Sequence, residues 1–182
     1  SLADGSYVAL GEGRSGTDSN PIYQTYLIKT DNNGAILWQK SYAGKIGKAM
    51  VATADGGFVV VGSVQGTGAF QVWYQLFKVD AGGNLVWEVT GEGGSTGLDI
   101  QQTIDGGFIT TGTKLTKHNA TGVISWTQIQ QGNAIVANAD GTFNTTTTEP
   151  NIVNGNPNLV IKKYTATGIL SSSNQIGPTG SD

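Results

Sequence analysis

Short apolar runs separated by glycine-containing turns fill the second quarter of the chain. We expect four strands there, A to D, at residues 48–53, 58–61, 72–79 and 85–88. Strand B is apolar at every position, which indicates a strand buried on both faces. Tight turns are expected at 54–57 and 80–83, because Asp accepts hydrogen bonds from its own turn and Gly tolerates a positive φ. With 62–71 as a longer connection, the pattern predicts one four-stranded antiparallel sheet.

The same pattern is repeated four times along the chain. Each copy has an Asp-Gly pair in the A–B turn, a Lys near the end of strand C and, in three copies, a Trp in strand D. These positions are Asp4, Asp55, Asp105 and Asp140; Lys29, Lys78, Lys117 and Lys163; and Trp38, Trp87 and Trp126, with Ser172 in the fourth copy. A repeat of roughly 50 residues made only of strands and turns predicts a stacked or radial β architecture.

The expected fold is therefore all-β, with about four four-stranded antiparallel blades of the β-propeller type. The blades fall at approximately 1–43, 44–93, 94–130 and 131–175, in one domain over residues 1–182. The first copy lacks its strand A and the third copy is short, so about fifteen strands are expected. Trp38, Trp87 and Trp126 are expected to pack against the next blade, since a large flat side chain buries much apolar area.

Composition narrows the classes of function. The chain has no Cys, which excludes disulfides and thiolate chemistry. Its net charge is −3 and it has no basic run, so nucleic acid is not an expected partner. No apolar run is long enough to span a bilayer.

No catalytic motif is recognisable, and we expect no enzyme activity, no metal and no cofactor. The Asp-Gly aspartates are interpreted as turn residues, the lysines as solvated strand positions, and His118 as a structural or surface residue. One catalytic alternative is left open, a pair of carboxylates that cleaves a glycosidic bond, because glutamates occur in several repeats. These are Glu12, Glu88, Glu92 and Glu149.

The connections B–C and D–A differ in every repeat, whereas A–B and C–D are short and alike. In an antiparallel sheet both variable sets lie at the same end, and variable loops on a rigid scaffold are typical of binding surfaces. Tyr23, Phe70, Trp73 and Tyr74 lie in or beside these loops and are the candidate ligand-binding residues. Trp73 is the preferred one, with the alternative that it fills a gap between blades.

Residues 76–88 and 54–62 resemble the repeats of secreted bacterial β-propellers, including surface proteins exported by the type IX route. The Asp-x-x-Gly-x-Leu-x-Trp part, seen at Asp80–Trp87, is also similar to the quinoprotein-type repeat. The resemblance implies an extracellular or cell-surface location and a ring of seven or eight blades. The chain would then be part of a larger ring, a half-ring that dimerises, or a four-bladed ring.

The leading hypothesis is a non-catalytic interaction module that binds a protein or a glycan through its variable loops. One alternative is a structural subunit in which another chain completes the first sheet by strand addition. The other is a fragment of a glycan-active or quinoprotein-like enzyme, whose active residues lie in further blades.

Overall fold

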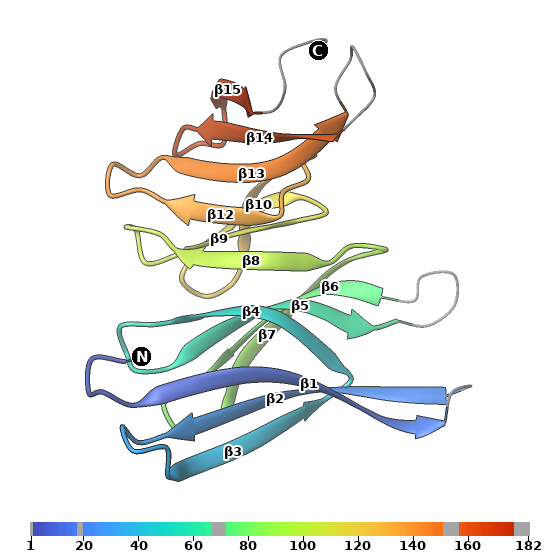
Figure 1. Cartoon of the computed structure of the whole chain (residues 1–182), viewed down its shortest axis with the longest axis vertical. Helices are drawn as coiled ribbons and strands as arrows, with labels where there is room; N and C mark the ends of the chain where they lie inside the picture. Colours follow the sequence, from blue (N-terminus) through green and yellow to red (C-terminus); the bar gives the residue numbers. More distant parts are fainter. Residues whose placement is uncertain (1, 18–19, 67–71, 151–156, 177–182) are drawn as a thin grey trace, which may run out of the picture. The chain divides into compact units, whose positions relative to one another are not determined.

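The computed structural model describes residues 2–17, 20–66, 72–150 and 157–176, which contain fifteen strands and no helix (Figure 1). The strands are β1(Tyr7–Thr17), β2(Asn20–Thr30), β3(Ile36–Ala43), β4(Lys45–Ala52), β5(Phe58–Gln65), β6(Val72–Val79), β7(Leu85–Gly93), β8(Gly97–Gln102), β9(Phe108–Gly112), β10(Leu115–His118), β11(Ile124–Gln128), β12(Ala134–Ala137), β13(Phe143–Pro150), β14(Pro157–Tyr164) and β15(Leu170–Ile176). The all-β prediction and the expected number of strands are confirmed. The described part of the chain holds no helix able to cross a membrane.

Four antiparallel sheets follow one another along the chain, and in each sheet the strands are paired in chain order. The first sheet, β1–β2–β3, has three strands, which confirms the missing strand A. The other three sheets have four strands each: β4–β7, β8–β11 and β12–β15.

Several predicted strand boundaries are wrong. β4 begins at Lys45, three residues earlier than expected, and β7 continues to Gly93 rather than ending at residue 88. Residues 62–65 were assigned to a connection, but β5 continues to Gln65, and Val64 pairs with Trp73 of β6. This polar-looking segment is strand because β6 offers a hydrogen-bonding partner along its full length, which overrides the weak local propensity of Gly and Ser.

The A–B and C–D turns are built alike in all four sheets. In each A–B turn a glycine adopts a positive φ, as Gly56 does at 78°. In the same turn the Oδ1 of Asp55 accepts hydrogen bonds from the Thr53 hydroxyl at 2.5 Å and the Gly57 amide at 3.2 Å. The C–D turns repeat this chemistry, with the Oδ1 of Asp80 accepting from two backbone amides. These aspartates therefore hold turns, as expected.

Strand C and strand D of every repeat share a β-bulge directly after the repeat lysine. The register places Trp38, Trp87, Trp126 and Ser172 opposite Lys29, Lys78, Lys117 and Lys163, respectively. The lysine and the residue opposite it therefore share one face of each sheet, which we call the lysine face. The opposite face carries the first residue of strand B, which is Phe in three repeats, and we call it the phenylalanine face.

The chain divides into two compact units, residues 1–97 and 98–182, and each has its own core. In the first unit, Leu27 and Tyr42 from the lysine face of β1–β3 pack against Phe58, Val60 and Phe77 from the phenylalanine face of β4–β7. The Trp38 ring also meets the Phe58 ring edge-on, with centroids 6.4 Å apart.

The second unit repeats this arrangement. Ile109 and Leu115 from the lysine face of β8–β11 pack against Phe143 and Tyr164 from the phenylalanine face of β12–β15. The Trp126 and Phe143 rings are 6.2 Å apart. In both units, a lysine face meets a phenylalanine face.

Candidate functional site

Each repeat joins the aspartate of its A–B turn to the lysine of strand C. The Nζ–Oδ2 distances are 3.8 Å for Lys29–Asp4, 2.5 Å for Lys78–Asp55, 2.8 Å for Lys117–Asp105 and 3.9 Å for Lys163–Asp140. The interpretation of the lysines as solvated strand positions is wrong for three of the four. The Lys117 side chain is only 7% exposed, whereas that of Lys163 is 43% exposed. The pairing occurs because strands B and C are neighbours, so a residue just before strand B lies beside the end of strand C.

The carboxylates of these pairs are held ionised. Burial acts to raise the pKa of Asp105, but hydrogen bonds from Lys117, Thr103 and the Gly107 amide outweigh it and lower the pKa to about 2. Hydrogen bonds from Lys78 and Thr53 likewise lower the pKa of Asp55 to about 2. Groups that stay charged across the physiological range do not exchange protons there, so neither suits general acid–base catalysis.

His118 is a core residue. It lies opposite Phe108, at the repeat position of Val79 and Tyr164, and is fully buried. Burial lowers its pKa to about 4, and its Nδ1 lies 2.9 Å from the Gly122 carbonyl oxygen. The imidazole is therefore neutral at neutral pH, and with Nδ1 protonated it donates to that carbonyl. Among the described residues, no group of three or more His, Asp or Glu side chains could hold a metal ion.

Three of the four glutamates left open by the sequence are held in ion pairs. Glu12 accepts from Lys48 at 2.7 Å, Glu149 accepts from Lys162 at 2.5 Å, and Glu88 accepts from Lys45. The Lys45 ammonium also lies 5.5 Å from the centroid of the Phe77 ring. Each of these carboxylates has its own lysine, which is the chemistry of structural ion pairs.

Two predicted ligand-binding residues come to the same interface. Tyr23 pairs with Arg14, and this register places it on the lysine face of β1–β3. Trp73 pairs with Val64, on the phenylalanine face of β4–β7. These two faces pack together in the first unit, so both aromatic residues border that interface at the end where strands B and C are joined, which we call the loop end.

The exposure of these aromatic residues differs. Trp73 is 36% exposed and Tyr23 is half-buried, so both present surface to a partner. The Tyr23 carbonyl accepts a hydrogen bond from the Gly44 amide at 2.8 Å, which ties β2 to the link between β3 and β4. The backbone under this surface is therefore fixed by hydrogen bonds, as a preformed binding site requires.

Tyr74 has a structural place instead. It is buried, and its ring covers two glycines: a Cβ added at Gly91 would lie 3.0 Å from its Cδ1, and one at Gly97 would lie 3.1 Å from its Cε2. Its packing leaves it no surface for a ligand. Phe70, the fourth candidate, lies outside the described residues.

Two of the three strand-D tryptophans contact the other sheet of their own unit. The Trp38 Nε1 donates to the Ala81 carbonyl at 3.0 Å, and its ring lies against Gly83 of the same C–D turn. Trp126 lies against Gly168 in the corresponding turn of the second unit. Trp87 lies opposite Lys78 on the lysine face of its sheet.

Sequence reasoning missed Tyr26. Its exposed ring covers Gly13, where an added Cβ would lie 2.5 Å from the Tyr26 Cε2, and it borders a shallow hollow with Ile28 and Gln39. The sequence did offer a signal. Tyr26 pairs with Gly11, and Gly13 lies two residues further along the same strand. Aromatic side chains commonly cover strand glycines of this kind.

Comparison with known proteins shows a likeness of fold alone. No family model matches the chain, and no curated protein matches it. A crystal structure of a protein of unknown function from Bacteroides caccae is similar, with a TM-score of 0.51 and 9% sequence identity. The likeness covers 86% of this chain and 77% of that one.

Proposed function

We propose that the chain is a non-catalytic interaction module made of β-propeller blades, which binds a protein or a glycan at its loop end. Its place of action is the cell surface or the extracellular space, as the resemblance of its repeats implies. The proposal rests on one observation. The turns at one end of the sheets share one geometry, whereas the connections at the other end differ from sheet to sheet.

The end of the sheets opposite the loop end holds the A–B and C–D turns, and we call it the turn end. These turns share one geometry, in which a glycine has a positive φ and a side-chain oxygen accepts hydrogen bonds from backbone amides. At the loop end, the B–C connections differ from sheet to sheet. They join Thr17 to Asn20, Gln65 to Val72, Gly112 to Leu115 and Pro150 to Pro157. Uniform turns serve the scaffold, whereas variable loops on a rigid scaffold supply recognition.

Trp73 is the residue most suited to recognition. A partly exposed indole stacks on a sugar ring or inserts into a protein pocket, and tryptophan is enriched among residues that dominate binding energy. Tyr23 borders the same interface and offers a second aromatic surface with a hydroxyl.

The test is binding of the purified chain to a panel of immobilised glycans and extracellular proteins. We expect Trp73→Ala to weaken binding to any ligand found by about tenfold or more, which corresponds to about 1.4 kcal/mol. Ile104→Ala is the matched control, since Ile104 is exposed in an A–B turn at the turn end. A ligand that binds the Trp73 variant normally but loses affinity for the Ile104 variant contradicts the proposal.

A second candidate, a structural subunit assembled by strand addition, is favoured by the three-stranded first sheet. β1 is an edge strand in the position that the second strand of every other sheet occupies. A strand from another chain would complete the four-stranded pattern. A synthetic peptide with the sequence of β4, residues 45–52, is the direct probe; failure to bind at millimolar peptide argues against this candidate.

A further inference from the structure

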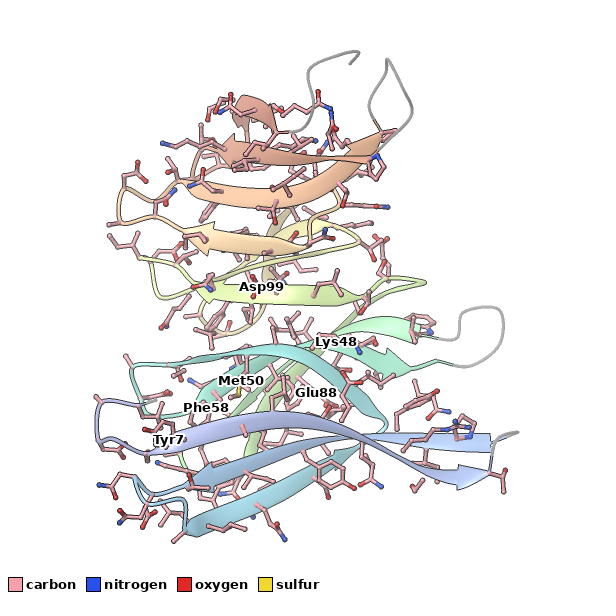
Figure 2. All side chains as sticks on the ribbon, viewed as in Figure 1. Tyr7, Lys48, Met50, Phe58, Glu88 and Asp99 are labelled. Carbon is pink, nitrogen blue, oxygen red and sulfur yellow. The ribbon has the colours of Figure 1, made fainter. Side chains whose placement is uncertain are left out.

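A hollow of about 540 Å³ opens at the turn end of the first unit, between the A–B turns of its two sheets. Its walls are mostly apolar and consist of Leu2, Ala3, Ala52, Ala54 and Ala81. The hollow lies next to the core of this unit, because Ala52 pairs with Phe58 and Leu2 packs against the same core cluster (Figure 2 labels Phe58). A hollow of this size with apolar walls is typical of sites that bind small molecules.

Two opposite charges also line the hollow, the ammonium of Lys29 and the carboxylate of Asp4. The Asp4 Oδ1 accepts hydrogen bonds from the Ser6 amide at 2.9 Å and the Ser6 hydroxyl at 2.5 Å. These bonds lower the pKa of Asp4 and keep its carboxylate ionised. The Oδ2 lies 3.8 Å from the Lys29 Nζ, which is beyond the length of a hydrogen bond. The hollow therefore holds a positive and a negative group that are close together but not in direct contact.

Among the four repeat lysines, only Lys29 is both nearly buried and loosely paired. Its side chain is 15% exposed, as is that of Lys78, but the Lys78 Nζ lies 2.5 Å from Asp55. Lys163 is paired as loosely, at 3.9 Å, but its side chain is 43% exposed and therefore hydrated. A poorly hydrated ammonium without a close counter-charge is costly. Lys29 therefore gains more than the other repeat lysines from an anionic group of a ligand.

The second unit has an equivalent hollow, whose described lining is uncharged. It measures about 580 Å³ and lies between the A–B turns of β8–β11 and β12–β15, beside Gln102 and Ala139. The repeat lysine of this unit, Lys117, instead donates to both carboxylate oxygens of Asp105 at 3.0 and 2.8 Å. Gln102 ends strand A of its sheet, so this hollow stays open beside a complete strand A. A strand A in the first sheet would leave the corresponding hollow open in the same way.

We propose that the hollow of the first unit binds a free α-amino acid with a large apolar side chain. The carboxylate of the amino acid pairs with Lys29, its ammonium pairs with Asp4, and its side chain packs against the apolar walls. The ammonium and carboxylate of an α-amino acid are joined through a single carbon, so their separation matches the gap between Lys29 and Asp4. A ligand with only a carboxylate would face Asp4 without compensation, and one with only an ammonium would face Lys29 in the same way.

This site goes beyond the proposed function. It lies at the opposite end of the sheets from Trp73, and it takes a small molecule rather than a glycan or a protein. A failure of one proposal therefore leaves the other standing.

NMR titration of the isotope-labelled chain with L-phenylalanine tests the proposal. Phenylpropionate lacks the ammonium of phenylalanine and phenethylamine lacks its carboxylate, so these two compounds are matched probes. With phenylalanine we expect saturable shifts at residues 2–4 and 52–56. Either probe should bind at least about tenfold more weakly than phenylalanine.

Two variants test the charges. Lys29→Met removes the ammonium, and Asp4→Asn removes the negative charge while keeping an oxygen for Ser6. Each should weaken phenylalanine binding at least about tenfold. Lys163→Met, at the equivalent position of the last repeat, is the control and should bind normally.

A second pair of variants tests the place of binding without altering a charge. Ala54 and Ala139 occupy equivalent positions in the two hollows, and both are exposed, so a larger side chain is compatible with folding. Ala54→Trp should fill the first hollow and abolish binding, whereas Ala139→Trp should bind normally. Circular dichroism shows that each variant is folded.

Three results would overturn the proposal. The first is the absence of shifts with phenylalanine up to its solubility limit. The second is normal binding by Lys29→Met or by Ala54→Trp. The third is phenylpropionate or phenethylamine binding as tightly as phenylalanine, because one of the two charges would then contribute nothing.

Discussion

Neutralising Asp105 by Asp105→Asn is expected to destabilise the second unit through Lys117. The Lys117 ammonium lies 3.0 and 2.8 Å from the two carboxylate oxygens of Asp105 and 3.0 Å from the His118 carbonyl. An asparagine keeps an oxygen for the Thr103 hydroxyl and the Gly107 amide, so the turn retains its acceptor. What is lost is the charge that compensates a buried ammonium.

The expected loss of folding free energy has one contribution from Asp105 and one from Lys117. Lowering the pKa of Asp105 from 3.8 to about 2 corresponds to at most about 2.4 kcal/mol of folding free energy. The Asp105 side chain is 61% exposed, so solvent screening reduces this contribution to about 1 kcal/mol. Leaving the nearly buried ammonium of Lys117 without its counter-charge adds to the loss, and we expect a total of about 1–2 kcal/mol.

Urea unfolding at pH 7, followed by tryptophan fluorescence, measures the loss, and Asp140→Asn is the matched control. Asp140 occupies the same repeat position in the same unit, but its lysine is 3.9 Å away and well exposed. The control should lose clearly less stability than Asp105→Asn. Because the pKa of Asp105 is lowered in the folded state, its contribution is present above pH 3.8 and is lost as the pH falls towards 2. Equal losses for the two variants, or no loss for Asp105→Asn, would refute this reasoning.

Two further predictions concern His118 and the turn glycines. His118 is the sole histidine, so NMR can follow its ring directly; we expect a pKa of about 4, and a value near 6.5 would mean that the side chain is solvated. Since burial lowers that pKa, the contribution of His118 to stability is present above pH 6.5 and is lost as the pH falls towards 4, and His118→Val should remove this acid-dependent part of the unfolding curve. Gly34 and Gly83 both have a positive φ, but an added Cβ at Gly34 meets nothing within 4 Å, whereas at Gly83 it lies 3.1 Å from the Trp38 ring. Gly34→Ala should therefore cost about 1–2 kcal/mol from backbone strain alone, and Gly83→Ala more, as measured by urea unfolding; equal costs would contradict the close contact with Trp38.

The repeat and its turns could be predicted from the sequence because they depend on local chemistry. Asp80 and Gly83 fix the C–D turn within a few residues, and the apolar run at 58–61 indicates burial without reference to other strands.

The Asp–Lys pairs were missed because they depend on register between strands. Asp55 precedes strand B and Lys78 lies near the end of strand C, so neither residue alone indicates a partner. Pairing Phe58 with Val79 would have brought them together, but that pairing follows only once the length of both strands is known. Tyr74 was assigned to the binding surface for a related reason. Its ring covers Gly91 of β7 and Gly97, the first residue of β8, and these contacts also depend on how strands lie side by side.

The central claim is that the chain binds its ligand at the loop end. Hydrogen exchange of the chain, with and without the member of the panel that it binds best, tests this claim most directly. The account predicts that ligand slows exchange at the loop end of the first unit, in residues 20–24 and 72–74. It also predicts no change in the turns at 53–57 and 80–84. Protection confined to those turns would contradict the account, because it would place the binding surface at the end of the sheets that we assign to the scaffold.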